Sequence, residues 1–382
     1  MRLPKGFQAS AVVAGIKPSG KPDLGLIHSQ APLAWALVST EHTFRAPCVS
    51  RNRARYTSGQ GVHGVVVNSG NANAATGEQG VWDNEDFAGM ATQALSLSRV
   101  QDILTASTGV VGQPLPVATL REVLPELAKG LHPNSDAFAE AILTTDTGPK
   151  QVAVTMSGGA RIVGVAKGSG MIHPNMATML VFVMTDADVP QSQLRELWPR
   201  LVDKTFNQIT VDGDTSTNDM ALLFSSQQMS VDPHEFADTL TQVCVRLTQK
   251  IARDGEGATK LLTVNVSGAR SEEEARVAAR AVAKSPLVKA AVHGNDPNWG
   301  RVLVAVGASE AVSDVVNLRI RVQGETVFYG VPRRFDAAAL SAAMNTEEVV
   351  FDISLGVGKA EATAWGCDLT REYVRINAEY TT

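Results

Sequence analysis

Cysteines and metal-binding motifs are scarce in this sequence. Its 382 residues contain three cysteines, Cys48, Cys244 and Cys367, which lie far apart and fit no paired motif. An odd, sparse set of cysteines is typical of a reducing compartment and argues against a disulfide-stapled fold. The seven histidines are scattered, and no HExxH, CxxC or EF-hand spacing occurs. We therefore predict neither a structural nor a catalytic metal.

Clustered positive charge and long apolar runs are also lacking. The net charge is −5 and no run of lysines or arginines occurs. This argues against a nucleic-acid partner, because neutralising phosphates needs clustered cations. The first residues, MRLPKGFQAS, lack the apolar segment of a secretory signal, and the most apolar stretch, Met176–Met184, is too short to cross a bilayer. We expect a cytoplasmic protein with no membrane partner.

Helix and strand patterns alternate in blocks along the chain. A hairpin is predicted over residues 152–165, and another strand pair over 318–329 with its turn at Gly324. The first 80 residues read as short strands and turns, and the chain after residue 283 reads as mainly strand. Apolar spacing and capping residues predict five helices, over residues 87–95, 117–127, 194–206, 233–251 and 271–283. No GxGxxG or GxxxxGK[ST] motif occurs, so the pattern favours an α+β fold rather than a nucleotide-binding one.

One loop could carry unusual chemistry. In KGSGMIHPNMATML (Lys167–Leu180), two glycines and then a proline precede Thr178, which stands at the start of a very apolar run. A hydroxyl placed in this way could attack the carbonyl of Ala177 in an N→O acyl shift. Hydrolysis of the resulting ester would leave Thr178 as a new N-terminus. Its α-amine, with a reference pKa of roughly 7.7–8.0, could then act as a general base. The spacing alone favours the plainer alternative, a strand threonine whose hydroxyl bonds to backbone.

The order of several longer motifs resembles one enzyme family. The chain is similar, over nearly its whole length, to the ornithine acetyltransferases of arginine biosynthesis, also called glutamate N-acetyltransferases. Besides the loop around Thr178, the matching segments are GVVVNSGNANAATG (64–77), ASTGVVG (106–112), TTDTGPK (144–150), DGDTSTND (212–219), DGEGATK (254–260), VHGNDPNWGR (292–301) and the terminal CDLTREYVRINAEYTT.

This resemblance implies a self-made nucleophile and a pair of oxyanion donors. Thr178 matches the family's nucleophile, and the bond between Ala177 and Thr178 matches its cleavage site. Thr108 and Gly109 match the oxyanion hole, where a hydroxyl and a backbone N–H would stabilise a developing negative charge. Without the resemblance, an ordinary glycine turn would explain the last two residues as well.

The resemblance also implies a set of substrate-binding residues. Lys167 would pair with an α-carboxylate, and Glu256 would hold either the δ-ammonium of ornithine or the amine of Thr178. Solvated loop positions are the alternatives for both. Polar substrate contacts are implied for Thr144, Asn377 and Thr382, together with Thr178 itself. The acidic cluster in segment 212–219 is given no role beyond a structured turn near the cleavage site.

The fold and reaction implied are those of a cleaved acyltransferase. We expect an αββα sandwich, as in the ornithine acetyltransferases and β-aminopeptidases, cut into chains 1–177 and 178–382 that pair as an α2β2 heterotetramer. Acetyl would pass from N2-acetyl-L-ornithine through Thr178 to L-glutamate, with no cofactor. Acetyl-CoA as a second acetyl donor stays open. Two alternatives remain, an N-terminal-nucleophile amidohydrolase or aminopeptidase, and an uncut protein that only binds amino acids.

Overall fold

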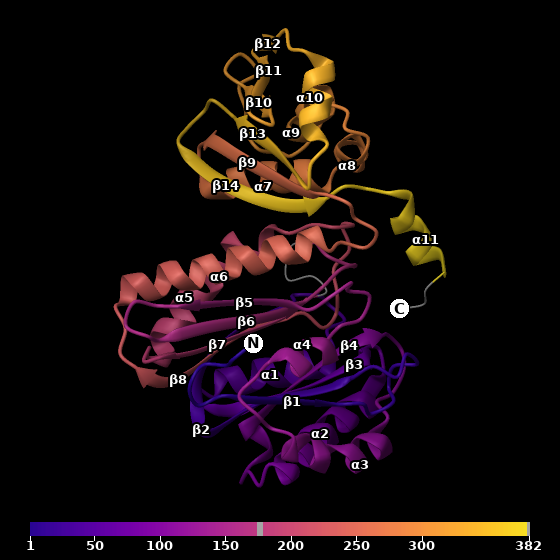
Figure 1. Ribbon diagram of the computed structural model, residues 1–382, viewed down its shortest axis with the longest axis vertical. Coiled ribbons are helices and arrows are strands. Elements are labelled where there is room, and N and C mark those ends of the chain that lie inside the picture. Colours follow the sequence, from indigo (N-terminus) through magenta and orange to yellow (C-terminus); the bar gives the residue numbers. More distant parts are fainter. Residues whose placement is uncertain (174–178, 380–382) are drawn as a thin grey trace.

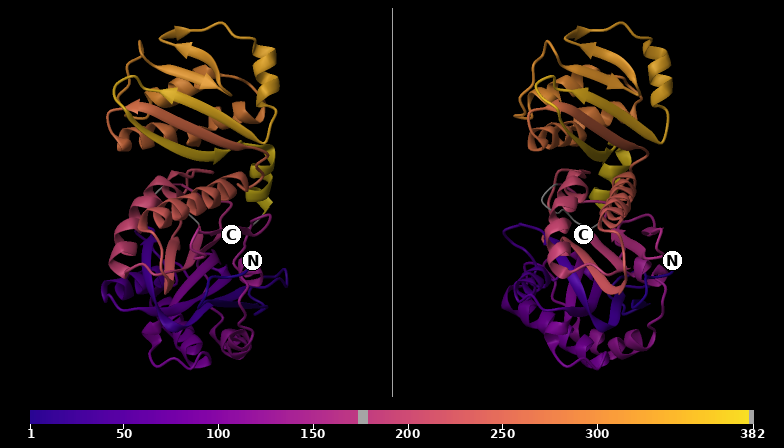
Figure 2. Two further views of the ribbon diagram at one scale, coloured as in Figure 1. Left: turned by 60° about the vertical axis from the view of Figure 1, so that its left-hand side comes forward. Right: turned by 90° about the vertical axis from the view of Figure 1, so that its left-hand side faces the viewer.

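The computed structural model describes residues 1–173 and 179–379. These residues form two lobes stacked along the long axis, followed by a C-terminal helix that runs back beside the first lobe (Figures 1 and 2). The predicted cleavage site, Ala177–Thr178, and the predicted contact Thr382 lie outside the described residues. Within those residues, no helix is long and apolar enough to cross a membrane.

The first lobe is built on one sheet that folds back on itself. Its strand order is β4-β3-β2-β8-β7-β6-β5, with β1 also paired to β2. The long strand β2 links the halves, because its first part pairs with β3 and its second part with β8. The strands are β1 (Gln8–Val12), β2 (Leu24–Ser39), β3 (Val62–Asn71), β4 (Ile103–Val110), β5 (Lys150–Thr155), β6 (Arg161–Lys167), β7 (Leu180–Ala187) and β8 (Met220–Met229).

This sheet forms an αββα sandwich, because alternate side chains along its strands pack into different cores. In β7, Phe182 joins a core that also holds residues of β3 and β4, whereas its neighbours Val181 and Val183 pack against the helix side. Two outer cores are covered by helices, one by α2 (Gly77–Ala94) and α3 (Val117–Lys129), the other by α5 (Gln191–Lys204) and α6 (Pro233–Arg253). The predicted αββα class is therefore confirmed. Two further helices, α1 (Pro47–Thr57) and α4 (Asp136–Ala141), contribute to the central core.

The predicted cleavage site would interrupt this sandwich rather than separate two lobes. Strands β6 and β7, on either side of it, are antiparallel neighbours, and Lys167 pairs with Leu180. Strand β8 lies between β2 and β7. Chains 1–177 and 178–382 would thus share one sheet and one core, although the cut between them stays a prediction.

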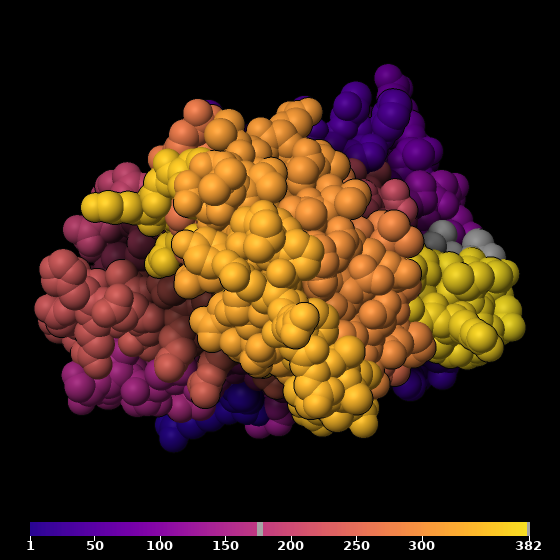
Figure 3. Space-filling model, turned by 90° about the horizontal axis from the view of Figure 1, so that it is seen from above, coloured from indigo at the N-terminus to yellow at the C-terminus, as the bar shows by residue number. Residues whose placement is uncertain are grey.

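The second lobe is a six-stranded sheet covered by helices. Its strands are β9 (Leu261–Ala269), β10 (Arg319–Val322), β11 (Glu325–Tyr329), β12 (Val331–Pro332), β13 (Glu348–Ser354) and β14 (Ala360–Cys367). Its helices are α7 (Glu272–Lys284), α8 (Pro286–His293), α9 (Trp299–Gly307) and α10 (Ala337–Met344). The last helix of the described residues is α11 (Arg371–Glu379), which has no buried side chain and projects beside the second lobe when the molecule is viewed from above (Figure 3).

The local predictions were confirmed where periodicity was strong and wrong where it was weak. All five predicted helices and both predicted hairpins are present. However, the first 80 residues contain the 16-residue β2 and helix α1, and four helices interrupt the expected strands after residue 283. Helix α9 shows the reason. Its sequence WGRVLVAVG reads as strand, but the Asn298 side chain caps it, and Val302 and Val306 pack into the lobe's core.

Candidate active site

One cavity gathers most of the predicted site residues. It has a volume of about 790 Å³ and lies where strand β4 ends, beside the loops that follow α4 and β6. Of the predicted residues, Thr108, Gly109, Thr144, Glu256 and Asn377 line it. They come from four separate segments of the sequence, so the fold has brought together what the motifs only suggested. Their individual roles stay predictions.

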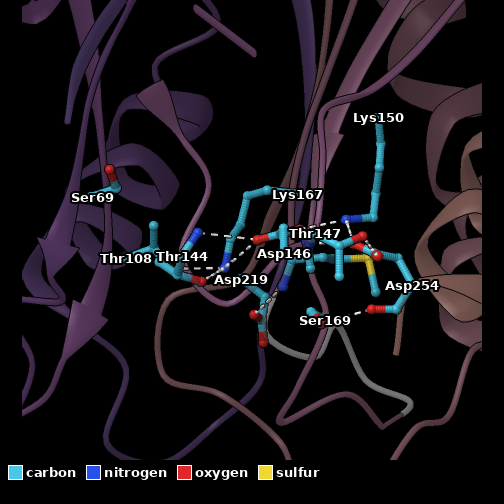
Figure 4. Close-up of polar contacts among 12 residues, drawn as sticks. Ser69, Thr108, Thr144, Asp146, Thr147, Lys150, Lys167, Ser169, Asp219 and Asp254 are labelled. Atoms are coloured by element: carbon cyan, nitrogen blue, oxygen red, sulfur yellow. Dashed lines mark hydrogen bonds and ion pairs between the residues drawn. The ribbon is translucent and has the colours of Figure 1, made fainter. Parts of the chain in front are cut away.

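Lys167 lies behind the cavity wall rather than on it. Its side chain is buried at the end of β6, and its Nζ donates hydrogen bonds to the hydroxyls of Thr144 (2.8 Å) and Thr108 (3.3 Å). Burial lowers the pKa of Lys167, an effect that Asp146 opposes. Figure 4 shows the lysine reaching between the two threonines and Asp146. Lys167 therefore orients the hydroxyl of Thr108, the predicted oxyanion donor.

A buried ion network holds this lysine in place. Asp146 accepts hydrogen bonds from Lys150 Nζ (2.5 Å) and from the amide of Gly168 (2.7 Å), and lies 4.0 Å from Lys167 Nζ. Lys150 also bonds to Asp254 (2.5 Å), as Figure 4 shows. Burial alone would raise the pKa of Asp146, but the two lysine charges outweigh it and hold that pKa at about 2. The charged groups of this network are held in fixed positions, and they preorganise the adjacent cavity wall.

The backbone conformation at position 109 requires a glycine, independently of the predicted role of Gly109. Its φ is +132°, and an added Cβ would lie 2.3 Å from the carbonyl carbon of Gly70 on the neighbouring strand. No side chain fits there, so the backbone of β4 reaches the cavity uncovered. A bare N–H at the end of a strand suits an oxyanion donor, although close strand packing alone would also select glycine.

Glu256 and Asn377 meet across the cavity from distant parts of the chain. Asn377 Nδ2, on α11, donates a hydrogen bond to Glu256 Oε2 (2.8 Å). The Glu256 amide donates to the carbonyl of Ser169 (3.0 Å), and an added Cβ on Gly170 would lie 2.4 Å from the Glu256 carboxylate. The absence of a side chain at Gly170 thus leaves room for a buried acid facing the cavity.

The acidic cluster of segment 212–219 has a structural task that the sequence did not reveal. Asp212 accepts hydrogen bonds from the amides of Met171 (2.6 Å) and Ile172 (2.9 Å), and Asp219 accepts one from the amide of Met179 (2.9 Å). These aspartates hold the two ends of the segment that contains the predicted cleavage site. Burial raises the pKa of Asp219 well above its ordinary value.

Sequence reasoning also missed the buried network and a lysine on the cavity wall. Asp146, Lys150 and Asp254 all lie inside matched segments, TTDTGPK and DGEGATK, so those segments held the signal. Lys17, which lines the cavity, lies in GIKPSGKPDLGL, a segment with no chemistry-bearing motif of its own. Its position in the cavity depends on tertiary structure.

A family model and several known proteins match this chain over nearly its whole length. The model of the ArgJ family matches residues 8–382. The arginine biosynthesis bifunctional protein ArgJ of Thermus thermophilus is 55% identical over 383 residues, covering 100% of both chains. A glutamate N-acetyltransferase of Methanosarcina acetivorans is 45% identical over 382 residues, covering 96% of each chain.

A solved structure gives a similar result for part of the fold. The crystal structure of the arginine biosynthesis bifunctional protein ArgJ of Bacillus halodurans is 38% identical, with a TM-score of 0.51, and the match covers 53% of this chain and 100% of that chain. Family model, full-length identity and shared fold agree, and the chain belongs to the ArgJ family.

Proposed function

We propose that this protein transfers the acetyl group of N2-acetyl-L-ornithine to L-glutamate, as a step of arginine biosynthesis. The observation that carries the proposal is the single cavity that gathers Thr108, Gly109, Thr144, Glu256 and Asn377. Its relatives' names agree, since one is a glutamate N-acetyltransferase and another an arginine biosynthesis bifunctional protein.

The reaction proceeds through an acetyl-enzyme. The Thr178 hydroxyl attacks the acetyl carbonyl of the donor and gives its proton to the α-amine of the same residue. Thr108 and the Gly109 amide stabilise the resulting oxyanion. The carbon–nitrogen bond then breaks, ornithine takes the proton and leaves, and an acetyl ester remains on Thr178. The free amine of glutamate attacks this ester, and N-acetylglutamate leaves. Acetyl passes between two amines of similar basicity, so the transfer needs no energy-supplying cofactor.

The proposed nucleophile requires cleavage between Ala177 and Thr178. The structure supports this indirectly. Asp212 and Asp219 hold the flanks of that segment, while Gly170 and Met171 line the cavity. The match to the solved Bacillus halodurans chain is complete for that chain and covers 53% of this one, close to the share of residues 178–382. Two such pairs of chains would form the α2β2 assembly in the cytoplasm.

The recognition of ornithine follows from charge. Glu256 is buried and held by Asn377, so its carboxylate offers a partner for the δ-ammonium of ornithine. An aminopeptidase or amidohydrolase of related fold would replace glutamate by water. A bifunctional enzyme would also accept acetyl-CoA. An amidohydrolase that cleaves N-acetylornithine would form the same acetyl-enzyme but pass the acetyl group to water, whereas a bifunctional enzyme would form it from acetyl-CoA as well.

Mass spectrometry and one kinetic comparison test the proposal together. The purified protein should give two chains, 1–177 and 178–382, whereas Thr178→Ala should stay uncut. Incubation with N-acetylornithine should add one acetyl group to the chain that begins at Thr178, and glutamate should remove it as N-acetylglutamate. Release of free acetate at the same rate without glutamate would favour the hydrolase. A full-length chain that transfers acetyl, or no transfer at all, would overturn the mechanism.

A further inference from the structure

The two proposed substrates place opposite charges in the same cavity. Ornithine carries a side-chain ammonium and glutamate a side-chain carboxylate, yet an exchange through one acetyl-enzyme must bind each beside the same nucleophile. Glu256 would attract the ammonium and repel the carboxylate. Recognition of glutamate therefore calls for a cation elsewhere on the cavity wall, an argument that rests on the proposed function.

Lys17 is the cation best placed for this task. It lines the same cavity as Glu256 and is half-buried, whereas Lys21, which also lines it, is exposed. Lys167 is fully buried and is already bonded to two threonine hydroxyls. Among the described residues, Lys17 thus combines access to the cavity with partial desolvation, which strengthens a charge-assisted hydrogen bond.

The loop that carries Lys17 is fixed. The buried carboxylate of Asp23 accepts hydrogen bonds from the amides of Ala14 (2.6 Å), Ile16 (2.6 Å) and Lys17 itself (2.9 Å). A lysine at the start of a loop tied down in this way is held in position before any ligand binds. Such preorganisation reduces the entropy lost on binding.

The ammonium of Lys17 is fixed too. Its Nζ donates hydrogen bonds to the carbonyl of Pro22 (2.9 Å), which lines the cavity, and to that of Ala141 (3.1 Å), the last residue of helix α4. An ammonium has three N–H donors, so these two described partners leave one donor for a ligand. Glu140 also lines the cavity but is exposed, and solvent screens its charge from that site.

We propose that Lys17 forms a carboxylate subsite that binds the side-chain carboxylate of the acceptor amino acid. In the same cavity, Glu256 binds the side-chain ammonium of the donor's amino acid. The cavity thus carries one partner for each charge. Lys17 selects glutamate against its neutral isostere glutamine and contributes little to the donor half of the reaction.

Acceptor discrimination by Lys17→Met tests this subsite. Loss of a charge-assisted hydrogen bond should lower kcat/KM for glutamate by about 10-fold to 100-fold. The value for glutamine should change little, so the glutamate-to-glutamine ratio should collapse. In a ping-pong reaction kcat/KM for N-acetylornithine reports only the donor half, and it should stay within about threefold. Lys17→Arg should keep most of the ratio.

Lys21→Met is the matched control, because it removes an exposed lysine of the same loop. Its glutamate-to-glutamine ratio should equal that of the unmodified protein. An unchanged ratio in Lys17→Met, or an equal loss in Lys21→Met, would overturn the subsite while leaving the proposed function intact. A misfolded Lys17→Met would lower donor and acceptor values together, and Lys17→Arg would then decide. No transfer by the unmodified protein would overturn the function and the subsite with it.

Discussion

The Asp219 carboxylate accepts a hydrogen bond of 2.9 Å from the amide of Met179, the residue after the predicted nucleophile. Because a peptide bond links Met179 to residue 178, this contact fixes the backbone at the start of the proposed second chain. The other carboxylate oxygen of Asp219 is buried without a hydrogen-bond partner among the described residues.

Replacing Asp219 should reveal the protonation of a buried acid. Burial raises its pKa, so the folded protein keeps a proton that the unfolded chain loses above about pH 4. This carboxyl therefore lowers stability as the pH rises from about 4 toward the folded pKa. Asp219→Asn still offers an acceptor to Met179 but cannot ionise. We expect the melting temperature of the unmodified protein to fall relative to Asp219→Asn between pH 4 and pH 8.

Asp219→Ala provides the comparison for that experiment. It removes the acceptor as well as the charge and leaves the buried Met179 amide unpaired, at a cost of about 1–3 kcal/mol. Melting curves recorded at four pH values for all three proteins give the answer. Parallel pH profiles of the unmodified protein and Asp219→Asn would contradict the raised pKa.

Much of the fold was predictable because its local signals agree with its packing. The capping residues Asp232 and Ser271 mark helix starts that the structure confirms, and the alternation around Gly158 predicts the β5–β6 hairpin. The boundary between the two lobes was not predicted, because no linker-like segment of the sequence divides them. Helix α9 shows the other limit, because tertiary packing overrides the strand propensity of its valines.

The site was predictable only in part, for a similar reason. Thr108, Glu256 and Asn377 were identified through motifs, and the fold places them around one cavity. Asp146 and Lys17 act through distant partners, Lys167 and the carbonyl of Ala141, and such long-range pairs leave no periodic trace in the sequence.

Neutralising Asp146 should destabilise the protein strongly at neutral pH. Asp146→Asn would leave Lys167 and Lys150 buried without this counter-charge, and breaking a buried pair costs about 3–5 kcal/mol. Because the folded pKa of Asp146 is held at about 2, its stabilisation is present above about pH 4 and is lost as the pH falls through about 2. Urea unfolding at pH 7 and pH 3 should show the difference from the unmodified protein shrinking on acidification.

The surface pair of Glu196 and Arg200 gives the control for Asp146. Both side chains are mostly exposed, so Glu196→Gln should change the free energy of unfolding by less than about 1 kcal/mol. A loss for Asp146→Asn as small as this would show that the buried network contributes little.

Removing the Thr108 hydroxyl should slow acetyl transfer without preventing folding. Thr108→Val keeps the shape of the side chain but deletes one predicted oxyanion donor, and loss of such a donor costs about 100-fold to 1,000-fold in kcat. Thr108→Ser restores a hydroxyl and should recover most of the rate. Lys167 keeps its shorter bond to Thr144 in both variants, so the melting temperatures should stay close. Equal rates for Thr108→Val and Thr108→Ser would exclude the hydroxyl from the transition state.

Alanine substitutions at two glycines on the cavity wall distinguish displacement of the Glu256 side chain from a general change in the loops. In Gly170→Ala the new Cβ would meet the Glu256 carboxylate at 2.4 Å, whereas a Cβ on Gly148 meets no heavy atom within 4 Å. The carboxylate is the movable partner, so Gly170→Ala should push it away from Asn377 and from its predicted contact with ornithine.

We expect kcat/KM for N-acetylornithine to fall by about 10-fold or more, with kcat/KM for glutamate reduced much less. Gly148→Ala should leave both values unchanged. If Gly170→Ala lowers the two values equally, Glu256 serves the nucleophile rather than the ornithine side chain, because the amine of Thr178 acts in both half-reactions and the δ-ammonium in only one.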